Sequence, residues 1–100
     1  MGIKYSREYA LIISEFAQAL GRIGDICLLL EMDASDWDRL PAPQRIECIR
    51  TAADDLFYAL GTEKEFTIGS AHVFLDEIHH RVCVRYADDT QAQIELLNRE

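Results

Sequence analysis

The hydrophobic spacing of this sequence changes once, at Gly61. Before this residue, apolar side chains recur every three or four positions, which is the spacing of one face of an α-helix. After it, apolar and polar residues alternate, as in Ala71, Val73 and Leu75, which is typical of a half-buried strand. The change predicts an α+β fold in which two helices come first and an antiparallel sheet follows.

The first predicted helix covers residues 6–32, with Ser6 as its N-cap. Gly21 and Gly24 lie near its middle, where each glycine costs up to about 1 kcal/mol relative to alanine. Either they allow another backbone to approach closely, or they break the helix. In the second case the apolar residues 26–30 become available for a short strand.

The second predicted helix covers residues 43–60 and should lie antiparallel to the first. Pro43 suits the first turn of a helix, and Gly61 suits the position that ends one. The connection before this helix contains Trp37, which we expect to fold back onto the core as an anchor.

The remaining residues predict a three-stranded antiparallel meander, with strands at 66–75, 81–86 and 91–97. Polar turn residues separate the three segments. The last segment has an alternative, because Asp89 could cap a short helix there instead.

The charge balance argues against two classes of partner. The chain has 18 acidic and 10 basic residues, a formal net charge of -8. Such a surface repels phosphate backbones and anionic lipid heads, because nucleic-acid affinity comes largely from Lys and Arg. No apolar run approaches the roughly 20 residues that a membrane-spanning helix needs. We therefore expect no nucleic-acid partner and no membrane partner.

Residues 1–100 are expected to form a single domain located in the cytoplasm. No stretch is polar or Gly/Ser-rich enough to act as a linker. The three cysteines, Cys27, Cys48 and Cys83, lack CxxC spacing and fall within apolar patterns, which indicates buried free thiols. The first residues lack the basic and apolar regions of a secretory signal.

No pattern in the sequence indicates catalysis. A nucleophilic cysteine needs a base and an orienting group beside it, and apolar surroundings disfavour a reactive thiolate. The segments GRIGD and TIGSA lack the glycine order of a phosphate-binding loop. We therefore predict a protein that is not an enzyme and that has no cofactor.

One histidine-rich segment offers an alternative function. Residues 72–83 contain three histidines, two acids and a cysteine, all of which can bind metal ions. A hairpin could bring His72 opposite His80 to hold a metal or a small ligand. However, the spacing matches no zinc signature, and adjacent histidines on a strand point to opposite faces. A solvated hairpin tip explains the same residues.

Three pairs of acidic residues could present a negative surface to a basic partner. Electrostatic complementarity of this kind speeds and orients association. The candidate partner-binding residues are Asp54, Asp55, Asp76, Glu77, Asp88 and Asp89, with Glu47 on the helix face of the first pair. The pattern favours a non-enzymatic protein–protein interaction module, such as an inhibitor or an immunity-type regulator.

The first predicted helix is apolar on more of its surface than one partner helix can cover. This surplus predicts a homo-oligomer, most simply a homodimer. The candidate interface residues are Ile12, Phe16, Ala19, Ile23, Ile26 and Leu30. The alternative is that the sheet and the second helix wrap the first helix on nearly all sides.

Overall fold

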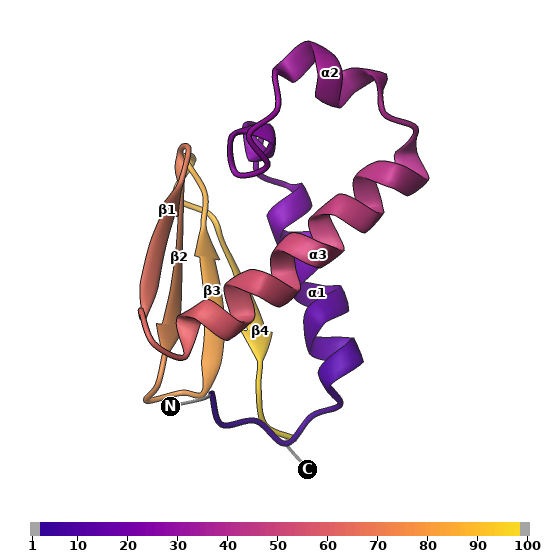
Figure 1. Ribbon diagram of the computed structural model, residues 1–100. Coiled ribbons are helices and arrows are strands. Elements are labelled where there is room, and N and C mark those ends of the chain that lie inside the picture. The colour runs from indigo at the N-terminus through magenta and orange to yellow at the C-terminus, as the bar shows by residue number, and fades with distance from the viewer. Residues whose placement is uncertain (1–2, 99–100) are drawn as a thin grey trace.

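In the computed structural model, which describes residues 3–98, helices cover one face of a four-stranded antiparallel sheet (Figure 1). The helical elements are α1 (Tyr9–Gly21), the 3-10 turn η1 (Ile26–Leu28), α2 (Ala34–Arg39) and α3 (Ala42–Leu60). The strands are β1 (Glu65–Ile68), β2 (Ala71–Asp76), β3 (Arg81–Arg85) and β4 (Gln91–Glu95). The predicted α+β class, with helices before the sheet, is confirmed.

The sheet is a meander in which every strand pairs with its neighbour in the sequence. Val82 of β3 lies opposite Leu75 of β2 on one side and Ile94 of β4 on the other. Directly paired residues share one face of a sheet, so this row and the row of Val73 form an apolar surface under the helices.

The sheet has four strands instead of the predicted three. The predicted strand 66–75 is divided by a tight turn at Gly69 and Ser70, which separates β1 from β2. Gly69 has φ +55°, in the left-handed region that favours glycine. The last segment forms β4 rather than the alternative short helix.

The first helix is shorter than the predicted range 6–32 and covers only Tyr9–Gly21. Glycine is a poor helix former, and two glycines three residues apart weaken the turn that would continue the helix. The chain leaves the helix between Gly21 and Gly24, and the next residues form η1 and turns. The helix break is confirmed, whereas the alternative of a strand after it is wrong.

The break lets neighbouring side chains point in different directions. Ile23 and Ile26 enter the core, each with 3% of its surface exposed. Between them, Asp25 reaches the β1–β2 turn, where its carboxylate accepts hydrogen bonds from Ser70 N at 3.2 Å and Ser70 Oγ at 3.3 Å. This contact ties the end of the α1 segment to the sheet.

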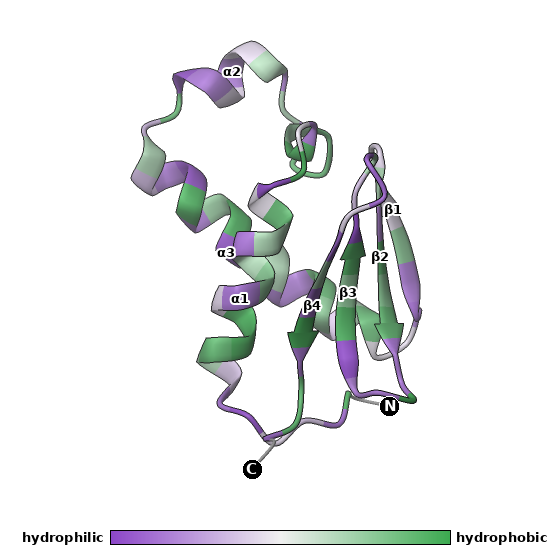
Figure 2. Ribbon diagram, turned by 180° about the vertical axis from the view of Figure 1, so that it is seen from behind, coloured by the Kyte–Doolittle hydropathy of each residue, from purple (hydrophilic) through white to green (hydrophobic). Residues whose placement is uncertain are grey.

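The second predicted helix, 43–60, corresponds closely to α3, which has a proline in its first turn. It crosses α1 instead of lying alongside it (Figure 1). Trp37 packs partly buried against the core, as expected, but from the short and unpredicted helix α2. The coil around η1 is hydrophobic and α2 is mostly hydrophilic (Figure 2).

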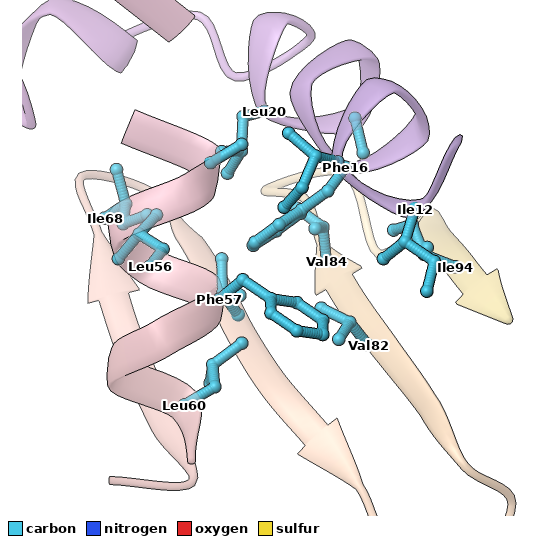
Figure 3. Close-up of a cluster of buried hydrophobic side chains, with 14 of the residues drawn as sticks. Ile12, Phe16, Leu20, Leu56, Phe57, Leu60, Ile68, Val82, Val84 and Ile94 are labelled. Carbon is cyan, nitrogen blue, oxygen red and sulfur yellow. The ribbon is translucent and has the colours of Figure 1, made fainter. Parts of the chain in front are cut away.

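The core lies between α1, α3 and the sheet. Phe16 of α1 and Phe57 of α3 point into the space between the helices and β3, where they meet Val82 and Val84 (Figure 3). Phe16, Val82 and Val84 have no exposed surface. Burying a large side chain of this kind contributes about 1.5–3 kcal/mol, so this cluster holds the layers together.

The two ends of the described chain meet at one end of the molecule. Ser6 N donates a hydrogen bond to the carbonyl of Leu96 at 2.8 Å. In return, Asn98 N donates to Ser6 Oγ at 2.9 Å, and Asn98 Nδ2 donates to the Ser6 carbonyl at 3.1 Å. Ser6 therefore bonds to the other chain end instead of capping a helix.

Candidate functional site

Most residues of the predicted oligomer interface are buried in the core of the single chain. Its residues Ile12, Phe16, Ala19, Ile23 and Ile26 are at most 5% exposed and belong to the core. This burial within one chain favours the alternative in which α3 and the sheet cover the first helix, although α1 keeps an exposed face at Tyr9, Ala10 and Leu11. The reason is that α1 ends early, so its apolar surface is small enough for one chain to cover. Only Leu30 keeps appreciable exposed surface.

The six predicted partner-binding acids are split among three places. Asp54 and Asp55 lie on α3. Asp76 and Glu77 stand at the β2–β3 turn, whereas Asp88 and Asp89 stand at the β3–β4 turn. These two turns are at opposite ends of β3, so the two pairs do not form one continuous surface.

Two of the turn acids are engaged by their own turns. The Asp76 carboxylate accepts a hydrogen bond from His79 N at 3.1 Å and shares a second hydrogen bond with His79 Nδ1 at 2.8 Å. Asp88 accepts from Thr90 N at 3.1 Å and from Thr90 Oγ1 at 2.6 Å. These bonds favour the charged carboxylates and lower the pKa of both Asp76 and Asp88. Their main role is therefore to stabilise the turns.

Two further acids also have partners within the chain. Glu77 lies 3.7 Å from the ammonium of Lys64. Asp54 accepts a hydrogen bond from the hydroxyl of Tyr9, and partial burial together with this bond raises the pKa of Tyr9. The contact joins α3 to the start of α1, so Asp54 also serves the fold.

The predicted histidine pair is not formed. The β2–β3 register places His72 opposite Arg85, whereas His80 lies at the other end of the hairpin, just before Arg81. The two histidines are separated by the length of β3, about 16 Å at 3.3 Å per residue. Within residues 3–98, no group of three or more His, Cys, Asp or Glu side chains is placed to hold a metal ion.

A groove of about 610 Å³ runs between α3 and the coil that follows η1, and we call it the α3 groove. It is open to solvent, because most of its lining residues keep exposed surface. It is lined by Leu29, Leu30, Met32, Glu47, Cys48, Thr51, Ala52, Asp55, Leu56 and Ala59.

The α3 side of the groove consists of two parallel rows of side chains. Glu47, Thr51 and Asp55 recur every four residues and form an exposed rim. Beside them, Ala52 and Leu56, each 8% exposed, form the floor. The opposite wall is formed by three half-buried apolar residues, Leu29, Leu30 and Met32, so the acidic residues that line the groove all lie on its α3 side.

The carboxylates on this rim differ from Asp54, Asp76, Glu77 and Asp88, which have partners within the chain. Neither Glu47 nor Asp55 has a hydrogen bond or an ion pair with another residue in the part of the chain that the structure describes. Of the two basic residues of α3, Arg45 and Arg50, neither lines the groove, and Arg50 lines a separate hollow with Tyr9 and Asp54. The α3 groove therefore combines apolar surface with two uncompensated negative charges.

Sequence reasoning identified Asp55 and the neighbouring Glu47 as part of an acidic helix face but missed the groove itself. The signal on α3 is the four-residue spacing of Glu47, Thr51 and Asp55. The sequence predicts a continuing helix over the residues of the other wall, Leu29, Leu30 and Met32, and a continuing helix does not place them beside α3.

Comparison with known proteins provides no relative for this chain. No family model matches it, and neither curated proteins nor solved structures give a significant match. In addition, no helix within residues 3–98 is long and apolar enough to span a membrane.

Proposed function

We propose that this protein is a non-enzymatic module that binds another protein through the α3 groove, and that it acts as an inhibitor or immunity-type regulator of that partner. The observation that carries this proposal is the apolar groove edged by the unpaired carboxylates Glu47 and Asp55. Apolar surface supplies affinity on burial, and unpaired charge supplies orientation and partner choice.

The net charge of -8 supports a basic partner, because the long-range field attracts positive surfaces and speeds their encounter. The free cysteines Cys27, Cys48 and Cys83 favour a reducing compartment, and we place the protein in the cytoplasm.

Site-specific photo-crosslinking in an extract of the native cell tests this proposal. A photoreactive amino acid at Thr51, on the groove rim, is compared with one at Gln93, an exposed position on β4. We expect a crosslinked protein at Thr51 that is missing at Gln93. The same products at both positions, or none at either, would contradict the proposal.

Charge reversal tests the same surface with the purified partner. The variant Glu47→Lys with Asp55→Lys should bind more weakly and depend less on salt. Its matched control is Asp38→Lys with Glu63→Lys, which makes the same charge change at exposed residues outside the groove. Equal binding by both variants would show that net charge, and not the groove, attracts the partner.

A further inference from the structure

We infer that the occupant of the α3 groove is an amphipathic α-helix of the partner, with two basic residues two turns apart beside its apolar face. This inference rests on the proposed function, because it specifies the partner of the same groove.

The length of the groove matches a short helix. Its α3 side runs from Glu47 to Ala59, which corresponds to about 18 Å at 1.5 Å per residue. About twelve residues of a second helix cover this distance. An extended peptide would instead need free backbone groups to pair with, and the backbone of α3 between these residues is hydrogen-bonded within the helix.

The cross-section of the groove also suits a helix. Cys48, Ala52 and Ala59 are small, so the axis of a second helix can approach the axis of α3 to about 8–10 Å, the ordinary distance between packed helices. Met32 stands on the opposite wall, where its flexible side chain can adapt to an apolar residue of the incoming helix.

The rim sets the spacing of the basic residues. Glu47 and Asp55 are about 12 Å apart along the axis of α3. In a partner helix, two residues seven positions apart lie on the same face and about 11 Å apart. Lys or Arg at two such positions can therefore reach both carboxylates while the neighbouring apolar face fills the groove.

The chain's own helices do not fit this description, which favours a different protein over a second copy. Within the described residues, α1 contains no Lys or Arg, and α2 contains only Arg39. The basic residues of α3, Arg45 and Arg50, are five positions apart and so point in different directions.

The test uses synthetic peptides of about 15 residues as probes, with leucines every three or four positions and two lysines seven positions apart. One control peptide has glutamates in place of the lysines. A second control peptide keeps the leucines and lysines of the first probe and has prolines at two central positions between them, so that no helix can form.

Binding is read out by protection of Cys48 from alkylation, followed by mass spectrometry. Cys48 is half-buried in the groove, whereas Cys27 and Cys83 are 8% and 1% exposed and react more slowly. Fluorescence anisotropy with labelled peptide gives the affinity. A Cys48→Ser variant serves as the control for the site of alkylation.

We expect the lysine helix to protect Cys48 and to bind at least about tenfold more tightly than the glutamate peptide at low salt. The variant Glu47→Lys with Asp55→Lys should reverse this preference. Circular dichroism checks that the variant is folded.

Three results would overturn the inference, and they separate it from the proposed function. Equal binding of the proline-containing peptide means that the groove takes an extended chain, which leaves the proposed function intact. Protection of Cys48 by concentrated protein alone, with a dimer in sedimentation, assigns the groove to a second copy. If no probe peptide protects Cys48 although position 51 crosslinks to a partner, the helical occupant is wrong and the proposed binding function remains.

Discussion

The β-meander and the segment from residue 22 to residue 41 both contain many apolar residues, but they bury them differently. In the meander, alternation and pairing place every second side chain under the helices, as with Val82 between Leu75 and Ile94. The segment 22–41 has no repeating face and buries residues singly, leaving Leu28 60% exposed. The strands of the meander leave no large hydrophobic side chain exposed, whereas the segment 22–41 leaves one for a partner.

Two substitutions of aliphatic side chains by alanine should show the largest difference in stability between the two regions. Ile94→Ala removes a side chain that is 2% exposed and should lower the free energy of unfolding by about 2–5 kcal/mol. Leu28→Ala removes one of similar size at 60% exposure and should change it by less than about 0.5 kcal/mol. Urea denaturation followed by circular dichroism measures both. Similar losses for the two variants would mean that the segment 22–41 is packed as tightly as the sheet.

The contact between the two regions can be broken at Gly69. A Cβ atom there would lie 2.2 Å from Asp25 Oδ2, and the backbone has φ +55°. Gly69→Ala should therefore destabilise the protein by about 2 kcal/mol, because the strained backbone and the displaced Asp25 carboxylate both cost free energy. Thermal denaturation measures the loss.

Gly24→Ala is the matched control, since nothing lies within 4 Å of its Cβ position. Its stability should stay the same or rise by up to about 1 kcal/mol. In an Asp25→Ala background, Gly69→Ala should cost less than in the wild-type chain. An unchanged cost there would assign the whole effect to the backbone and none to the contact.

The smallest expected effect lies at the β2–β3 turn. The hydrogen bonds from His79 keep the pKa of Asp76 below its ordinary value of about 3.9. The carboxylate therefore stabilises the fold above about pH 4, and this contribution is lost as the pH falls through the lower folded pKa. In His79→Ala, the pKa of Asp76 measured by NMR should rise toward about 3.9. An unchanged titration would show that other groups hold the carboxylate.

The predictable parts of the fold are those in which local signals agree. Pro43, the helical spacing and Gly61 together located α3 to within about one residue, because each marks a different part of one regular element. The turn at Gly69 and Ser70 was overlooked, although Gly-Ser between two alternating runs is a recognised hairpin signal.

The candidate site was less predictable, because its two walls are far apart in the sequence. Asp55 was identified from its charge alone, whereas the segment 29–32 becomes a wall only after the helix break at Gly21 turns the chain toward α3. Two of the predicted interface residues, Ile23 and Ile26, reach the core from the segment after α1 instead of from a continuing α-helix, which their spacing does not show. Periodicity describes one element at a time and does not say which elements meet.

The hydrogen bonds between Ser6 and Asn98 bear on how the chain can be reconnected. A short linker could join these neighbouring ends, and the chain could be opened at the β2–β3 turn, where Ile78 is 86% exposed. Exposed turns are the sites at which circular permutation is usually tolerated. Such a permutant would begin with β3 and end with β2, so it would keep the α3 groove while converting the central strand pairing into one between the new ends.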